Sequence, residues 1–172
     1  QSPGFLIASF KHKNKLIAQF YKEGLYEFIN GSFEQILDTK LMPELVAIIA
    51  SAEDDFYFST MGVIYKSGNP NTPFKDYSNE FGSTNAVTKL NNGDYAIGTQ
   101  NNGLFILNPN FTIKQHFTKN NGLSDRTVKS VYEDNFTNLW VALNSGIDYL
   151  KMSLPFSLLN EEVGVEGTGY AA

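Results

Sequence analysis

The apolar and polar positions of this chain alternate in short runs and do not follow helical spacing. Residues 120–150 show the pattern most clearly: an Asn-Asn-Gly turn, an alternating stretch at 127–132, a polar turn at 133–138 and the apolar run Leu-Trp-Val-Ala-Leu at 139–143. A further turn leads into a third stretch at 147–150. Three short strands joined by tight turns within about 30 residues predict an up-and-down antiparallel meander.

This pattern occurs four times along the chain. The first strands begin their apolar positions at Leu6, Val46, Val87 and Val128, and a glycine opens each third strand, at Gly24, Gly62, Gly103 and Gly146. Both series repeat after about 40 residues, which is the period of a four-stranded propeller blade. No run of ten or more residues has apolar side chains at helical spacing. The sequence therefore predicts an all-β fold, a β-propeller of about four four-stranded blades.

The period also sets the expected blade boundaries. We expect blades at 4–38, 44–78, 86–118 and 127–161, and the start of a further blade at 164–172. The expected strands are 5–10, 15–20, 24–29 and 32–36, then 45–50, 55–60, 62–66 and 74–77, then 86–90, 94–99, 103–107 and 112–117, and finally 127–132, 139–143, 147–150 and 156–160. Because it holds two prolines, the loop 67–73 should lie outside the sheet. Since the chain begins and ends within a repeat, we expect it to be a segment of a larger propeller.

The second strand of each unit is apolar at almost every position, as at 16–20, 95–99 and 139–143. A strand covered on one face would alternate, so continuous apolar runs indicate sheets that are covered on both faces. Trp140 is therefore expected to be buried between neighbouring sheets. A two-sheet sandwich is the competing fold, and it would show less regular spacing and cleaner alternation.

Composition narrows the possible functions. The chain has 172 residues, of which 18% are charged, and its net charge is −5. Without clusters of Lys and Arg it does not match a nucleic-acid-binding protein. It has no cysteine, so it can form neither a disulfide nor a cysteine metal site. No apolar run approaches the ~18 residues of a membrane span, so no membrane insertion is expected in this segment.

Candidate catalytic and metal-binding residues are few. His12 and His116 are the only histidines, and neither has a carboxylate at ligand spacing, so we expect surface or edge residues and no metal site. Glu133 and Asp134 are adjacent in the chain, so they point to opposite faces and cannot flank one scissile bond. Asp134 is expected to cap the turn that follows. We predict no catalytic residue and no cofactor.

The stretch Gly122 to Leu143 resembles the two-component regulator propeller repeat. That repeat reads roughly Gly-Leu-Ser, Val-x-x-Ile-x-Glu-Asp, Leu-Trp-Ile-Gly-Thr and Gly-Leu. The matching positions here are Gly122-Leu123-Ser124, Val128, Val131, Glu133-Asp134, Leu139-Trp140-Val141 and Gly146-Ile147. The third unit matches through Val87, Leu90, Ala96-Ile97-Gly98-Thr99 and Gly103-Leu104, and the first two units match weakly. Ala142-Leu143 departs from the Gly-Thr of the repeat.

The resemblance implies a sensory role. Such propellers form the extracytoplasmic sensor regions of hybrid histidine kinases in Bacteroidetes, where they sense products of glycan breakdown. It implies a non-catalytic, ligand-sensing segment in the periplasm, with an oligosaccharide as a possible ligand and the output domain outside this chain. Two other functions stay open: a propeller enzyme acting on polysaccharide, either a lyase or a glycosidase, and a protein-interaction scaffold.

Strand counting places the turns after the second strands and the links between units on one rim, where binding loops gather. The residues expected to contact a ligand there are Gln100, Asn101, Asn102, Asn120, Asn121, Ser124, Asp125, Arg126, Asn144 and Ser145. We also expect the end blades of an open arc to associate, as a homodimer or with further blades of a longer protein. The faces involved would draw on Phe5, Leu6, Ile7, Leu16 and Ile17 at one end and on Leu139, Trp140, Val141 and Ile147 at the other.

Overall fold

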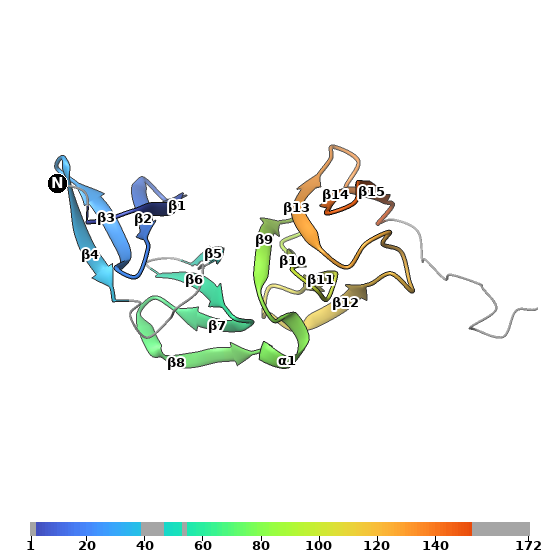
Figure 1. Ribbon diagram of the computed structural model, residues 1–172, viewed down its shortest axis with the longest axis horizontal. Coiled ribbons are helices and arrows are strands. Elements are labelled where there is room, and N and C mark those ends of the chain that lie inside the picture. Colours follow the sequence, from blue (N-terminus) through green and yellow to red (C-terminus); the bar gives the residue numbers. More distant parts are fainter. Residues whose placement is uncertain (1–2, 39–46, 53–54, 153–172) are drawn as a thin grey trace, which may run out of the picture.

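A computed structural model describes residues 3–38, 47–52 and 55–152. Its strands form antiparallel sheets that stand side by side along an arc, and each sheet is built from strands that follow one another in the chain (Figure 1). The first sheet, blade 1, contains β1 (Leu6–His12), β2 (Lys15–Phe20), β3 (Gly24–Ile29) and β4 (Ser32–Leu37). The second sheet, blade 2, contains β5 (Ala47–Ala52), β6 (Asp55–Thr60), β7 (Val63–Lys66) and β8 (Asn69–Asp76).

Blades 3 and 4 complete the arc. Blade 3 contains β9 (Thr84–Lys89), β10 (Tyr95–Thr99), β11 (Leu104–Leu107) and β12 (Ile113–Phe117), and the described part of blade 4 contains β13 (Val128–Glu133), β14 (Leu139–Leu143) and β15 (Ile147–Leu150). A short helix, α1 (Ser78–Phe81), lies in the link between blades 2 and 3. The predicted all-β architecture of propeller-type blades is confirmed. The strand predicted at 156–160 and the further unit at 164–172 lie outside the described residues.

One loop prediction is wrong. The segment 67–73 was expected outside the sheet because of Pro70 and Pro73, yet β8 begins at Asn69 and pairs with β7. Its register shifts twice, and Pro73 stands opposite Tyr65. β8 is the outermost strand of its sheet, and an edge strand tolerates prolines because one side of its backbone needs no partner.

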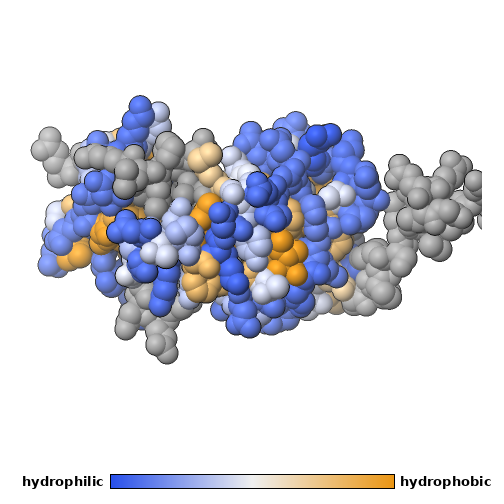
Figure 2. Space-filling view, turned by 90° about the horizontal axis from the view of Figure 1, so that it is seen from below, coloured by the Kyte–Doolittle hydropathy of each residue, from blue (hydrophilic) through white to orange (hydrophobic). Residues whose placement is uncertain are grey.

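The core lies between the blades. Ile17 and Leu25 of blade 1 pack with Phe58 of blade 2. Ile64 of blade 2 and Ile97 of blade 3 belong to the next cluster. A third and larger cluster joins blade 3 to blade 4, and it contains Ala96, Leu104, Ile106, Val128, Leu139 and Val141. The outer surface is mainly hydrophilic, with hydrophobic residues confined to separate patches in the view of Figure 2.

Hydrogen bonds reinforce the approach of blades 3 and 4 through their first strands, β9 and β13. The Oγ1 atom of Thr88 donates to the carbonyl of Val131 at 2.7 Å, and Nδ2 of Asn85 donates to the carbonyl of Val128 at 3.1 Å. The backbone amide of Asn91 donates to Oε2 of Glu133 at 2.7 Å. These bonds fix one blade against the next, so the loops at the ends of the strands keep a defined spacing.

The repeated glycines have a steric cause. Gly103 has a φ of +76°, and a Cβ atom there would collide with the carbonyl oxygen of Phe117. Gly62 has a φ of +80°, and a Cβ atom would lie 2.7 Å from the carbonyl oxygen of Tyr77. At both positions the chain turns into a third strand against the end of the fourth strand, and only glycine combines this φ with so little space.

Two residues differ from their predicted environment. Trp140 was expected between sheets, but it is 47% exposed on the outward face of blade 4, where its ring lies 4.7 Å from that of Tyr149. In the apolar run of β14, Leu139 and Val141 point toward blade 3 and Trp140 points the other way. His12 was expected at the surface or an edge; it lies on β1, an edge strand of its sheet, but it is only 4% exposed. His116 is exposed, as predicted.

Candidate functional site

Three loops meet on one rim of blades 3 and 4. They are the turn at 99–103 between β10 and β11, the link at 118–127 between β12 and β13, and the turn at 144–146 between β14 and β15. The amide of Gly103 donates to the carbonyl of Arg126 at 2.8 Å, which joins the first turn to the link. The amide of Asn144 donates to the carbonyl of Thr127 at 3.2 Å, which joins the link to the last turn. The structure therefore brings together the loops that strand counting placed on a common rim.

A cleft of about 450 Å³ opens between the first turn and the link. It is lined by Asn101, Asn102, His116, Thr118, Lys119, Asn120 and Arg126. Four of these, Asn101, Asn102, Asn120 and Arg126, are among the residues expected to contact a ligand. Sequence reasoning missed His116, Thr118 and Lys119, which lie at the end of the fourth strand and just beyond it.

His116 forms a fixed wall of the cleft. Its ring stacks on that of Phe105, with 3.8 Å between the ring centroids and 10° between the planes. Nε2 lies 2.6 Å from the carbonyl oxygen of Asn102, a distance at which Nε2–H donates. Nδ2 of Asn121 donates to the carbonyl of His116 at 2.8 Å. The imidazole is thereby held from both its face and its edge, so it presents a preformed flat surface to the cleft.

The link at 118–127 is shaped by its own side chains. Oδ1 of Asn121 accepts from the amide of Thr118 at 2.5 Å and from its hydroxyl at 3.0 Å. Ser124 donates through its amide and its hydroxyl to the carboxylate of Asp148, each at 2.6 Å. Asn121 and Ser124, both expected as ligand contacts, therefore bond within the protein and hold the loop.

Asp125 also acts within the loop. Its Oδ1 accepts from the amide of Thr127 at 3.0 Å. This bond, a second from the hydroxyl of Ser145, and the nearby ammonium of Lys119 hold the pKa of Asp125 below its ordinary value. Asp125 and Ser145 thus stabilise the rim, and neither lines the cleft. Gln100 and Asn144 are exposed on the same rim outside the cleft lining.

The cleft carries positive charge on a negatively charged chain. Lys119 and Arg126 are both exposed, and neither forms an ion pair with any residue in the described ranges. Asn101 and Asn120 are likewise exposed. The side chain of Asn102, by contrast, donates to the carbonyl of Glu80 at 2.7 Å and positions the turn. The cleft therefore offers two cationic groups, amide groups and a stacked ring to a bound molecule.

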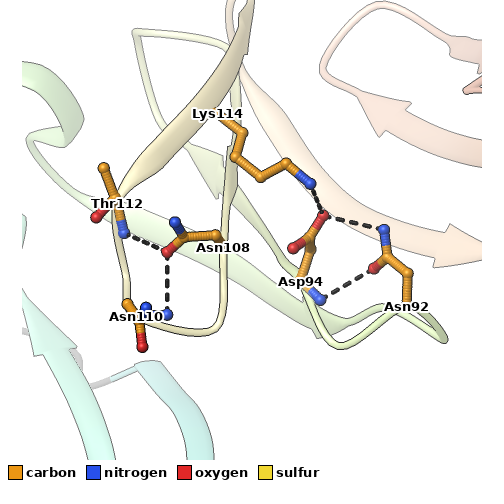
Figure 3. Close-up of polar contacts among 6 residues, drawn as sticks. All are labelled: Asn92, Asp94, Asn108, Asn110, Thr112 and Lys114. Atoms are coloured by element: carbon orange, nitrogen blue, oxygen red, sulfur yellow. Dashed lines mark hydrogen bonds and ion pairs between the residues drawn. The ribbon is translucent and has the colours of Figure 1, made fainter.

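A second hollow, of about 380 Å³, lies near the turn between β9 and β10 and has a different character. Asp94, which is 4% exposed, lines it and pairs with Nζ of Lys114 at 2.5 Å (Figure 3). Asn92 donates to the same carboxylate at 3.0 Å and accepts from the amide of Asp94 at 2.9 Å. The charged pair and Asn92 thus bond one another and shape the turn between β9 and β10.

Asp134, from the acidic pair considered above, has the structural role predicted for it. Its Oδ1 accepts from the amides of Phe136 and Asn138 at 2.8 and 3.0 Å, which caps the turn between β13 and β14. Within the described ranges, no three His, Cys, Asp or Glu side chains gather as metal ligands would. In the same part of the chain, no helix is long and apolar enough to cross a membrane.

Comparisons with known proteins place this architecture. No protein-family model matches the chain, and no curated protein is significantly similar to it. Among solved structures, the extracellular domain of the BT3049 two-component system from B. thetaiotaomicron superposes with a TM-score of 0.61 at 15% identity, over 88% of this chain and 24% of that one. The chain folds as blades of a β-propeller. The extracellular domain of BT4673 from the same organism gives a TM-score of 0.61 at 21% identity, over 84% of this chain and 21% of that one.

The propeller fold is shared with proteins of different function. A streptogramin B lyase superposes with a TM-score of 0.58 at 17% identity, over 86% of this chain and 55% of that one. Likeness at these identities establishes the fold, and function must be argued from the site. The chain spans about a quarter of the length of the two extracellular domains. Both extracellular domains come from two-component systems, the class of protein whose propeller repeat the stretch Gly122 to Leu143 resembles.

Proposed function

We propose that this propeller segment is the non-catalytic, ligand-sensing part of an extracytoplasmic two-component sensor, and that the cleft between blades 3 and 4 binds an oligosaccharide. The cleft carries the proposal, because it is a preformed hollow whose exposed Asn101, Asn120, Lys119 and Arg126 side chains lie where strand counting expects binding loops. The resemblance of the repeat and the fold shared with extracellular sensor domains support the sensory role.

The chemistry of the cleft suits a sugar. Its volume of about 450 Å³ falls within the range of small-molecule sites. Asparagine amides donate and accept, so they can pair with hydroxyl groups in either direction. The ring of His116, held flat by Phe105, offers a surface on which a pyranose ring can lie. Lys119 and Arg126 would add donors and would favour a ligand with a carboxylate.

A longer ligand would continue along the rim. Gln100 and Asn144 are exposed beyond the cleft, and we propose them as further contacts for sugar units that leave it. Asn121, Ser124, Asp125 and Ser145 would act indirectly, by holding the link and the last turn in place. Signal output would come from a kinase or another output domain outside this chain, with the propeller on the periplasmic side.

The enzyme alternative makes a different prediction for the same cleft. A glycosidase needs two carboxyl groups facing the scissile bond, and the described cleft lining contains neither Asp nor Glu. A lyase would need His116 or Lys119 as a base. Its signature would be a new unsaturated product during incubation with an acidic polysaccharide, and we expect none.

Calorimetric titration with a panel of neutral and acidic oligosaccharides tests the proposal. We expect at least one to bind, and Arg126→Ala and Asn120→Ala each to weaken that binding by about tenfold or more, equivalent to about 1.4 kcal/mol. Asn110→Ala is the matched control, because Asn110 is an exposed asparagine in the turn between β11 and β12. If the cleft variants bind as well as the control, the site is elsewhere. If no oligosaccharide in the panel binds, the sensory assignment to this cleft fails.

A further inference from the structure

The cleft between blades 3 and 4 gathers positive charge in an acidic chain. The chain has 13 Lys and Arg residues against 18 Asp and Glu residues. The described lining of the cleft reverses this balance, because it contains Lys119 and Arg126 but neither Asp nor Glu. Two cations in one hollow create a local positive potential, which raises the concentration of anions there. The charge of the cleft therefore favours an anionic ligand.

Both cations project from backbone that is already fixed. Beside Lys119, the amide of Thr118 donates to Oδ1 of Asn121 at 2.5 Å. At the other end of the same link, the carbonyl of Arg126 accepts from the amide of Gly103 at 2.8 Å. A bound molecule therefore has to order only the two side chains and not the loop that carries them, which lowers the entropic cost of binding.

Asp125 offsets part of this charge. The pKa of its carboxyl group is lowered by the Thr127 amide, by the Ser145 hydroxyl and, more weakly, by the nearby ammonium of Lys119. The same attraction neutralises part of the charge of Lys119, and the Asp125 carboxylate would repel an anionic ligand. Arg126 forms no ion pair with any residue in the described ranges, so it supplies the larger share of the available charge.

A carboxylate carried on a sugar ring fits this set of groups. The guanidinium of Arg126 is a planar fork that pairs with the two oxygens of a carboxylate, and an ammonium can add a further donor. In a hexuronate the carboxylate is bonded directly to the pyranose ring, so the ring and the charge reach the protein together. The flat ring of His116, with its centroid 3.8 Å from that of Phe105, lies in the same cleft as both cations.

We propose that the cleft selects acidic oligosaccharides, with Arg126 and Lys119 holding the carboxylate of a hexuronate unit whose pyranose ring lies on His116. This inference rests on the proposed function, since it names the class of sugar that the same cleft takes. Asp125 weakens the preference for the acid, because it competes for Lys119. The exposed amides of Asn101 and Asn120 pair with hydroxyl groups of either acidic or neutral sugars, so they do not contribute to the preference.

Calorimetric titration with matched pairs of ligands tests the selection. The probes are oligomers of galacturonate, mannuronate and glucuronate, each compared with its own methyl ester, which keeps the ring and its stereochemistry but removes the charge. We expect at least one acid to bind about tenfold or more tightly than its ester. Raising the salt concentration from about 0.1 M to about 1 M should remove most of this difference, because the Debye length falls from about 10 Å to about 3 Å.

Substitutions of opposite sign assign the charge to residues. Arg126→Gln should remove most of the roughly tenfold preference for the acid, and Lys119→Gln a smaller part, with little change in the affinity for the ester. Asp125→Asn should strengthen binding of the acid alone, since asparagine keeps an Oδ1 acceptor for the Thr127 amide. Lys129→Gln is the control, because Lys129 is an exposed lysine of β13 outside the cleft lining.

The outcomes separate this inference from the proposed function. If an ester or a neutral oligosaccharide binds as tightly as the acids and the cleft variants weaken it, the cleft remains the site and the selection for acids is wrong. A sulfated neutral oligosaccharide that binds more tightly than every uronate also overturns the selection. So does a preference that survives both glutamine substitutions in the cleft or that Lys129→Gln removes equally. If no sugar binds, the assignment of the cleft itself fails, and the inference fails with it.

Discussion

Replacing Gly98 by Ala tests how closely blades 3 and 4 approach each other. Gly98 lies in β10, and a Cβ atom there would lie 2.5 Å from Cγ1 of Val128 in β13 and 3.2 Å from Cβ of Ala86. Carbon atoms pack at about 3.5–4.0 Å, so β13 would have to move by roughly 1 Å. Val128 is fully buried and β-branched, so its side chain has little freedom to rotate away.

Two opposing effects decide whether Gly98→Ala raises or lowers the free energy of unfolding. Gly98 has no positive φ, so alanine fits the backbone and would, without the contact, stabilise the protein by about 0.4–1 kcal/mol through the unfolded state. Overpacking a close-packed core costs about 1–3 kcal/mol. The second effect is the larger one, and we expect the free energy of unfolding to fall by roughly 1–2 kcal/mol.

Urea titration followed by circular dichroism measures this change. Gly4→Ala is the control, because a Cβ atom at Gly4 would meet its nearest neighbour, Cγ of Glu23, at an ordinary 3.5 Å. Val128→Ala alone should cost about 1.6 kcal/mol for its two lost methyl groups. In combination with Gly98→Ala it should cost less, because the new methyl group occupies part of the vacated space. A Gly98→Ala protein more stable than wild type would refute the proposed approach of the two blades.

Two further predictions concern stability. Phe58→Ala should lower the free energy of unfolding by about 3–5 kcal/mol in urea titrations, because Phe58 is fully buried between blades 1 and 2. The control, Phe136→Ala, changes an 80% exposed side chain and should alter this free energy by less than about 0.5 kcal/mol. Equal losses in the two variants would contradict the packing of Phe58 between these blades. The pKa of Asp125 is lowered because the Thr127 amide, Ser145 and Lys119 favour the charged carboxylate. The carboxylate therefore stabilises the folded protein at pH values above the unfolded-state pKa, and this stabilisation is lost as the pH falls through the folded-state pKa. Asp125→Asn should lower stability at neutral pH and reduce its loss on acidification, and a pH–stability curve parallel to that of the wild type would contradict this.

The repeat could be read from the sequence because its determinants are local. A positive φ at Gly62 and Gly103, together with a carbonyl where Cβ would be, requires glycine, so the period appears in the sequence itself. The asparagine-rich turns mark the strand ends in the same way. The pairing of β8 was not readable, because the prolines that break a central strand are acceptable at an edge, and only the fold shows which strand is the edge.

The orientation of Trp140 could not be predicted from its apolar run. Every position in residues 139–143 is apolar, so the pattern carries no information about which face is covered. The strand register does show it, because Trp140 stands opposite the exposed Tyr132 and Tyr149. The equivalent residues of the other three units, Ile17, Tyr57 and Ala96, pack against the following blade. Of the residues expected to take part in association, Ile17, Leu139 and Val141 are buried between blades, whereas Leu16, Trp140 and Ile147 are 44%, 47% and 69% exposed.

The sequence predicts which loops lie together at the candidate site, but it does not predict which side chains line the cleft. Strand parity places the three loops together, and the structure joins them through Gly103, Arg126, Thr127 and Asn144. Which polar side chains are left to contact a ligand depends on hydrogen bonds that the sequence does not show. One is the bond that the Thr118 amide donates to Oδ1 of Asn121. Another is the bond that the Ser124 hydroxyl donates to the Asp148 carboxylate.

Amide chemical-shift mapping by NMR tests most directly whether the cleft between blades 3 and 4 binds an oligosaccharide. The titrant is the tightest-binding sugar from calorimetry, added to isotopically labelled protein. We expect saturable shifts at Asn101, Asn102, Lys119, Asn120 and Arg126, with the amides of the β11–β12 turn at 108–112 unchanged. Saturable shifts that appear only in the 108–112 turn or around the hollow at Asp94, with the cleft amides unmoved, would contradict the proposed site.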